Sequence, residues 1–377
     1  MILYDRKLAT VYKEYGIMLP ISPSRADRIV TFLEQNGALE QAPVKPVFDI
    51  PGALHILGDR EPVITRADVE RVHQREFVAD LYEGSEGLEQ ALLNAWELID
   101  CQGRPNRYEP DKKLKPLEGL FQNVLAQVQG TYLASRLALS GKEGRPGFCY
   151  YLGGGMHHSR YDHGTGFCLI NDIVIAARKL QAENRAVLIW VIDVDAHKGC
   201  GTAELVRFAR DRGELGYSPK GPDICNLSIH MASGWPLDPE TLKTALPDRA
   251  PRIEADAEIP IPQAGEALYI EALEKGITLL ETRSQNRSPD LVIVVDGADP
   301  YKDDELLSSS PLKLSLEQCL QRDRRIYEYL QKRRLPSVWL MAGGYGEHAW
   351  EPAAYFLKSL IKTAGKPYRK NPLGLGI

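Results

Sequence analysis

The chain has 377 residues, of which 26% are charged and 44% hydrophobic, proportions typical of a soluble globular protein with a sizeable core. The formal net charge of −5 provides no global basic field, so neither nucleic acid nor an acidic membrane is expected as a partner. No apolar stretch reaches the length of a membrane span, and no charged segment followed by a secretory apolar core opens the chain, so we expect a cytoplasmic protein.

No linker, repeat or low-complexity segment divides the chain, and we expect residues 1–377 to form one domain. The cysteines have no paired spacing and should be free thiols, most of them buried. They are Cys101, Cys149, Cys168, Cys200, Cys225 and Cys319.

The first part of the chain has weak secondary-structure signals. We expect a short strand at 1–4, a helix at 24–35, mostly helical structure over 66–100 with breaks at Gly84 and Gly87, and an exposed loop over 104–115. The clearest helix follows, because its apolar residues recur at spacings of three and four. These residues are Leu117, Leu120, Phe121, Val124, Leu125, Val128, Tyr132 and Leu133.

Five apolar runs with strand character then alternate with helical segments. The predicted strands are 148–152, 186–192, 223–230, 291–295 and 337–342, and the predicted helices are 173–181, 266–282, 315–333 and 353–363. This alternation predicts an α/β fold: a single open, doubly wound, mostly parallel sheet flanked by helices. In such sheets ligands bind beyond the carboxyl ends of the strands.

Two motifs rich in His, Asp and Gly stand at those ends. The first is Gly153-Gly154-Gly155-Met156-His157-His158, which continues into Gly166-Phe167-Cys168, and the second is Asp193-Val194-Asp195-Ala196-His197. An isolated pair of histidines is usually structural. Three glycines before the pair favour a site instead, because they let the backbone turn tightly and approach a ligand.

These residues allow amide hydrolysis. Asp195, His197 and one of the acids Asp303 or Asp304 could supply three metal ligands from separate strand ends, as in a catalytic zinc site. Zinc would activate a water molecule, and a neighbouring imidazole could take the proton of that water and return it to a leaving amine.

Taken together, the motifs resemble those of the zinc-dependent histone deacetylase family, within the arginase/deacetylase fold, from about residue 108 onward. The resemblance rests on these two motifs, Ser228-Ile229-His230, the segment from Gly297 to Asp304, and Gly343-Gly344-Tyr345. The details look closest to the class IV branch. The resemblance implies one zinc ion per chain, bound by Asp195, His197 and Asp304, with Asp304 preferred to Asp303 because of the family's spacing.

The resemblance also implies roles for residues around the zinc. His158 matches the general base, His157 the second histidine of the site, and Tyr345 the hydroxyl that polarises the substrate carbonyl. Asp193 resembles the acid that orients His157. With Ser228, Asp193 also resembles the lining of a structural K⁺ site.

A narrow channel for the acyl-lysine stem is implied as well. Gly166 and Phe167 resemble one wall of this channel, and Trp235 is a candidate for the opposite wall. The implied substrate is an acyl-lysine in a protein or peptide, or an acetylated small amine.

Cys200 and Lys198 depart from the pattern, since many members have Asp or Asn at the first position and His at the second. Because a thiol is a poor partner for the base, a weakly active acyl-lysine-binding protein is one alternative. An acetylpolyamine amidohydrolase is another. An arginase-like dimanganese enzyme is disfavoured, because Gly199 stands where that chemistry needs a second aspartate.

Overall fold

The computed structural model of the chain describes residues 1–39, 49–58, 64–100, 102–141, 146–216, 220–238 and 253–363. Within these residues lies a seven-stranded sheet of order β1-β2-β7-β6-β3-β4-β5, and each pair of neighbouring strands is parallel. The strands are β1 (Ile2–Leu3), β2 (Phe148–Tyr151), β3 (Leu188–Asp193), β4 (Asp223–Met231), β5 (Ala257–Ile261), β6 (Leu291–Val295) and β7 (Ser337–Leu340).

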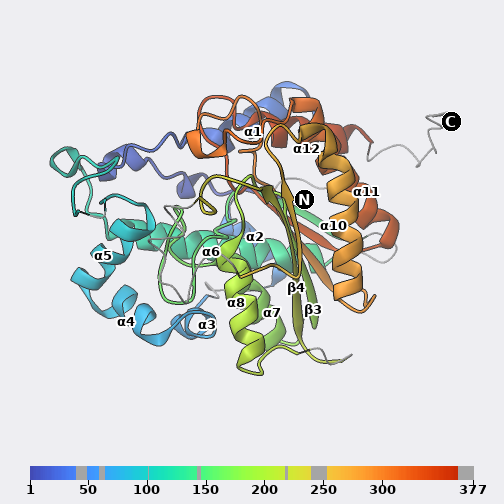
Figure 1. The fold of residues 1–377 in the computed structure, drawn as a ribbon, viewed down its shortest axis with the longest axis horizontal. Coiled ribbons are helices and arrows are strands. Elements are labelled where there is room, and N and C mark those ends of the chain that lie inside the picture. The colour runs from blue at the N-terminus through green and yellow to red at the C-terminus, as the bar shows by residue number, and fades with distance from the viewer. Residues whose placement is uncertain are drawn as a thin grey trace.

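Helices cover both faces of the sheet (Figure 1), so the predicted α/β fold with an open parallel sheet is confirmed. The helices are α1 (Arg25–Gln35), α2 (Ile50–Leu57), α3 (Arg66–Glu70), α4 (Arg75–Glu83), α5 (Ser85–Ala95), α6 (Gly119–Leu139), α7 (Asp172–Ala182), α8 (Cys200–Asp211), α10 (Tyr269–Arg283), α11 (Leu316–Arg333) and α12 (Glu351–Thr363). Short 3-10 helices are η1 (Arg6–Leu8), η2 (Tyr12–Tyr15), η3 (Pro110–Lys112), η5 (Glu266–Leu268) and η6 (Leu307–Ser309).

The strand side chains alternate between two apolar cores. In β3, Ile189 and Val191 pack in the core shared with α2, α6, α7 and α8. Leu188, Trp190 and Ile192 pack in the core shared with α1, α10, α11 and α12. Helices cover both faces of β3, so all of its positions are buried. This explains why its sequence is a continuous apolar run rather than an alternation of apolar and polar residues.

The topology places a crevice between β3 and β6. These strands are neighbours, but the chain proceeds from β3 to β4 on one side and from β6 to β7 on the other. The loops after β3 and β6 therefore diverge at the carboxyl edge of the sheet, and this is where an open α/β sheet binds its ligands.

Some sequence predictions need correction. The strand β5 was not expected, because Pro260 interrupts its short sequence, and proline within a sheet is tolerated mainly at an edge such as this one. Gly84 ends α4 as predicted, but Gly87 lies inside α5 and does not break it. The helices α2 and α8 were also not predicted.

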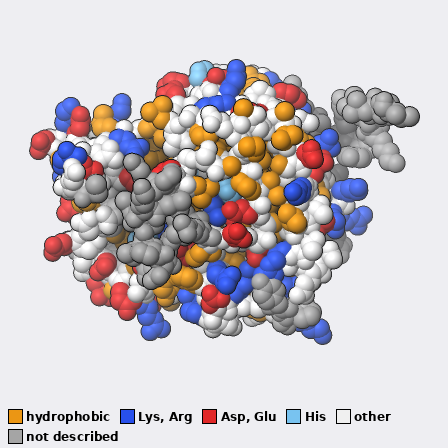
Figure 2. Space-filling model, in the orientation of Figure 1, with side chains coloured by type: hydrophobic (Ala, Val, Ile, Leu, Met, Phe, Trp, Pro, Cys, Tyr) orange, Lys and Arg blue, Asp and Glu red, His pale blue; other side chains and the backbone are white. Residues whose placement is uncertain are grey.

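The predicted helix 315–333 is present as α11, and a capping box of Ser315 and Gln318 opens it. The described cysteines are free and buried, and Cys101 lies outside the described residues. No described helix is both long and apolar enough to cross a membrane. On the face in Figure 2, acidic and basic side chains are interspersed.

The close packing of α6 on β2 predicts the effect of Gly130→Ala. Alanine is the better helix former, yet the new Cβ would stand 2.2 Å from the hydroxyl of the buried Tyr151. We expect Gly130→Ala to lower the free energy of unfolding by about 1–3 kcal/mol. Thermal unfolding measures this, with Gly119→Ala in the same helix as the control, because its Cβ would meet only ordinary contacts. An unchanged melting temperature for Gly130→Ala would contradict the packing.

Candidate active site

Four neighbouring strands deliver the candidate residues to one edge of the sheet. His157 and His158 follow β2, Asp195 and His197 follow β3, Asp299 follows β6, and Tyr345 follows β7. Because β2, β7, β6 and β3 are consecutive parallel strands, their carboxyl ends meet. The sequence motifs therefore converge as predicted.

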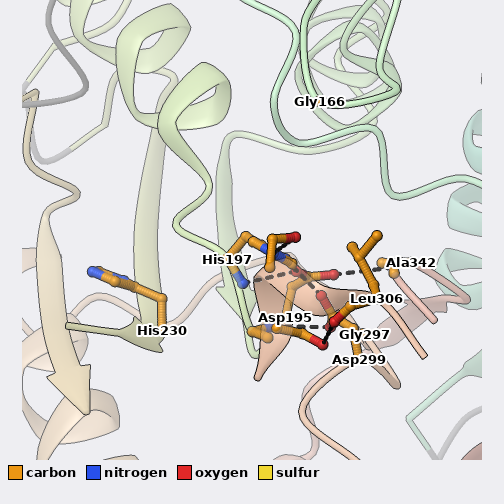
Figure 3. Close-up of polar contacts among 12 residues, drawn as sticks. Gly166, Asp195, His197, His230, Gly297, Asp299, Leu306 and Ala342 are labelled. Atoms are coloured by element: carbon orange, nitrogen blue, oxygen red, sulfur yellow. Dashed lines mark hydrogen bonds and ion pairs between the residues drawn. The ribbon is translucent and has the colours of Figure 1, made fainter. Parts of the chain in front are cut away.

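Asp195, His197 and Asp299 form a buried cluster with the donor types of a metal site. One ligand atom of each lies within 4.8 Å of the others. The Nδ1 atom of His197 is 2.7 Å from Oδ2 of Asp299 and 3.3 Å from Oδ1 of Asp195. In Figure 3 these side chains point toward one another, whereas His230 lies apart on the neighbouring strand.

The electrostatics of this cluster favour a cation. Burial raises the pKa of Asp299, and the neighbouring Asp195 raises it further. Burial opposes protonation of His197, but Asp195 and Asp299 outweigh burial and raise its pKa to about 10. Two carboxylates and one imidazole with ligand atoms within 4.8 Å of one another are a donor set that fits a divalent metal ion such as zinc.

The structure corrects the placement of Asp304, which does not join the cluster. Its Oδ2 accepts from the backbone N–H of Tyr345 at 2.7 Å, and its Oδ1 accepts from the N–H of Leu306 at 2.9 Å and from Ser309 Oγ at 3.1 Å. The carboxylate thus ties two loops together. Asp299 takes the third position near Asp195 and His197.

The paired histidines differ in their surroundings. His157 Nδ1 lies 2.7 Å from Asp193 Oδ2, as predicted. Burial lowers the pKa of His157, but Asp193 and Asp195 outweigh burial and raise it to about 9. Burial, followed by the charge of His157, lowers the pKa of His158 well below its ordinary value. In the metal-free site, His157 is therefore charged and His158 is neutral at neutral pH.

Cys200 contacts His158, since its Sγ lies 3.7 Å from Nδ1 of the imidazole. Burial raises the pKa of the Cys200 thiol, so the partner of His158 is uncharged. The side chain of Lys198 forms a partly buried ion pair with Glu258, with 2.7 Å between Nζ and Oε1. Of the two residues that depart from the family pattern, Cys200 therefore contacts His158, whereas the side chain of Lys198 pairs with Glu258.

Two of the predicted channel residues, Gly166 and Phe167, line a cavity of about 220 Å³ together with His157, His158, Asp195, His197 and Tyr345. Trp235, predicted for the opposite wall, is not among the residues that line this cavity but packs against Gly166 and His158. Gly166 has the left-handed φ of 56°, and a Cβ there would stand 2.3 Å from the Trp235 ring and 2.7 Å from His158. The Trp235 ring lies edge-on to His158 with 4.6 Å between centroids.

Tyr345 also lines the cavity, with 6.0 Å between its ring centroid and that of Phe167. Burial, followed by the charges of Asp299 and Asp195, raises the pKa of its phenol well above the ordinary value. The hydroxyl therefore stays protonated and can donate a hydrogen bond to a developing oxyanion.

Asp193 and Ser228, predicted to line a K⁺ site, are register partners on β3 and β4. Ser228 Oγ lies 3.1 Å from His230 Nδ1 and accepts from the N–H of Gly199 at 3.4 Å. The structure therefore brings the two predicted residues side by side.

Sequence reasoning missed several supporting residues. Asp172 accepts from the backbone N–H groups of Gly155 and Met156 at 2.9 and 2.6 Å, and so fixes the glycine turn before the histidines. Ser308 Oγ lies 3.0 Å from His197 Nε2. Arg25 lines the cavity and donates to the carbonyl of Ala342 at 2.7 Å. Only Asp172 carried a signal, since it stands at the start of a predicted helix.

Comparison with known proteins identifies relatives. Residues 19–359 match the family described as the histone deacetylase domain. Histone deacetylase 2 of Arabidopsis thaliana is 25% identical over 328 residues, which are 86% of this chain and 69% of that protein. The acetoin utilization protein AcuC of Staphylococcus aureus (strain MSSA476) is 30% identical over 272 residues, 69% of this chain and 61% of that protein.

A solved structure shares the fold. The acetylpolyamine aminohydrolase from Burkholderia pseudomallei superposes with a TM-score of 0.59 at 19% identity, and the match covers 97% of this chain and 99% of that one. The matched region is thus nearly all of that protein, but only about two thirds of the plant relative and less than two thirds of AcuC.

The contact between Cys200 and His158 predicts that Cys200→Asp raises the pKa of His158. A carboxylate at this position favours the charged imidazolium, and we expect an increase of about one unit or more. NMR titration of the imidazole in metal-free protein measures the pKa, with Cys200→Ser as a neutral control that should leave it low. An unchanged pKa in folded Cys200→Asp protein would show that residue 200 does not set the basicity of His158.

Proposed function

The chain belongs to the histone deacetylase family, and from the hydrolase chemistry of that family we propose that it hydrolyses the amide of acetyl-lysine or a related acyl-lysine, with one zinc ion per chain. The observation that carries this proposal is the cluster of Asp195, His197 and Asp299 next to the two histidines. These residues would hold the zinc. When bound, zinc supplies a Lewis acid that activates water and polarises a carbonyl.

Three protein residues would each have a separate role in the reaction. His158, neutral because its pKa is lowered, can accept the proton of the attacking water and deliver it to the leaving amine. His157, whose ring is fixed by Asp193, can stabilise negative charge that develops beside it. The protonated hydroxyl of Tyr345 can donate to the carbonyl oxygen as it gains charge.

The same region supports a lysine-sized channel. Phe167 and Gly166 line the cavity beside the histidines, and the Trp235 ring packs behind Gly166, where a Cβ would collide with it. Such walls would pack against the methylene stem of an acyl-lysine. We also propose that residues 1–377 form one deacetylase-like domain of the class IV type, with a structural K⁺ near Asp193 and Ser228.

An acetylated small amine is the second candidate substrate, because an N-acetyl group on a primary amine presents the same scissile amide. The relative from Burkholderia pseudomallei is an acetylpolyamine aminohydrolase by name. The uncharged partner of His158 favours modest turnover for either substrate. Both candidates would use the same residues.

We expect Asp299→Asn to lose zinc and Asp304→Asn to retain it. The first change removes a donor from the cluster, whereas the carboxylate of Asp304 binds backbone N–H groups of two loops. Metal content after dialysis against a weak chelator measures the difference. Retained zinc in Asp299→Asn together with lost zinc in Asp304→Asn would restore Asp304 as the ligand.

We expect Tyr345→Phe to keep its fold and zinc but lose about 10²–10³-fold in kcat, because only the oxyanion donor is removed. Acetate release is measured with an acetyl-lysine peptide and with an acetylpolyamine, and Tyr327→Phe, on α11, is the control. Faster turnover of the polyamine by the wild-type chain would favour the second candidate. Unchanged turnover of both substrates by Tyr345→Phe would overturn the role of this hydroxyl.

A further inference from the structure

Arg322, on α11, is a buried cation that the proposed reaction does not use. Arg322 is only 1% exposed to solvent, and its guanidinium contacts the two loops that carry Asp195 and Asp299. Buried guanidinium groups are costly unless each donor finds a partner. The partners of Arg322 therefore show what holds it in place.

One nitrogen of Arg322 bridges the two loops. Nη1 donates to the carbonyl of Val194 at 3.1 Å and to the carbonyl of Gly297 at 2.9 Å. Val194 directly precedes Asp195, and Gly297 stands two residues before Asp299. A single side chain thus links the end of β3 to the end of β6.

The other nitrogens fix the plane of the guanidinium. Nη2 donates to Asp296 Oδ1 at 2.6 Å, and Nε donates to Asp323 Oδ1 at 2.7 Å. The second oxygen of Asp296 accepts from the hydroxyl of Tyr150 at 2.7 Å. Since a guanidinium is planar, two anchored edges determine where Nη1 lies.

The linked loops carry like charges at close range. A Cβ on Gly297 would stand 2.4 Å from Oδ2 of Asp195, so the loops leave no room for a side chain there. The carboxylates of Asp195 and Asp299 are both buried and have oxygens within 4.8 Å of each other, so their repulsion opposes this approach. The bonds from Arg322 to both backbones oppose that repulsion from the core side of the loops.

We propose that Arg322 is a positioning residue for the metal site: by tying Val194 to Gly297, it holds the carboxylates of Asp195 and Asp299 at ligand spacing before an ion arrives. This inference rests on the proposed zinc site. It concerns how tightly and in what geometry the chain binds the ion. Removal of groups that orient metal ligands typically weakens binding by about 10–100-fold.

The test compares Arg322→Lys with Arg210→Lys. Arg210 carries a partly buried guanidinium that also pairs with two carboxylates, Asp223 and Asp256, and donates to a strand carbonyl, that of Ile224. It lies at the opposite, amino-terminal end of β4 and β5. Lysine keeps the charge in both variants but cannot span the same set of acceptors.

Both variants should unfold at a lower temperature, but only Arg322→Lys should bind zinc about 10–100-fold more weakly, measured by competition with a chelator. Its cobalt-substituted form should also differ from the wild-type chain in visible absorption, which reports ligand geometry. Equal zinc affinity and spectra for Arg322→Lys and wild type would overturn the inference, as would an equal loss of affinity in Arg210→Lys.

The failures can be told apart. A wild-type chain that binds no zinc would overturn the proposed function and this inference with it, whereas normal zinc binding by both wild type and Arg322→Lys would overturn the inference alone. If Arg322→Lys does not fold, Asp323→Asn is measured in the same way. That change keeps the guanidinium but weakens the anchor of Nε, so a smaller loss of affinity is expected, and an unchanged affinity would overturn the inference.

Discussion

The concentration of buried carboxylates at one edge of the sheet is the constraint on which the site depends. Asp193, Asp195, Asp296, Asp299 and Asp304 are all buried there. Such charges are stable only when cations and hydrogen-bond donors compensate them. His157 pairs with Asp193, His197 contacts Asp195 and Asp299, and Arg322 pairs with Asp296.

This distribution of charge also separates the two histidines. They are neighbours in the chain, with 3.9 Å between ring centroids, yet only His157 has a carboxylate on its Nδ1. His158 has the thiol of Cys200 in the corresponding place. A histidine pair with one charged and one neutral ring is suited to combine charge stabilisation with proton transfer. The identity of residue 200 thus bears directly on the basicity of His158.

The fold makes this arrangement possible because all the site loops leave the same edge of a parallel sheet. The chain leaves β3 and β6 toward opposite sides of the sheet, which opens a crevice between their loops, and helices bury both faces of the sheet behind it. The loops are in turn bonded to each other. Asp304 binds the backbone of Tyr345, and Asp172 binds the turn before His157. Rigid support of this kind keeps reacting groups in place without a change in the chemistry they perform.

The amino-acid sequence alone predicts the fold class, six of the seven strands and the meeting of the motifs, because buried parallel strands need continuous apolar runs and their ends share one edge. The strand 291–295 was predicted with the bounds that β6 has. The predicted helix 315–333 likewise begins within one residue of α11.

Tertiary structure alone decided which acid beyond β6 faces the site. Asp299 and Asp304 belong to the same acidic loop, and the direction of each carboxylate depends on which N–H groups the folded loops offer it. The role of Arg322 could not be predicted either, because a lone arginine on a polar helix is expected to be exposed to solvent. Only the folded chain places its guanidinium between the ends of β3 and β6. The periodicity of apolar residues along the chain predicts which positions are buried. The contacts of Asp304 and Arg322 join residues more than 20 positions apart, and no local sequence pattern predicts such contacts.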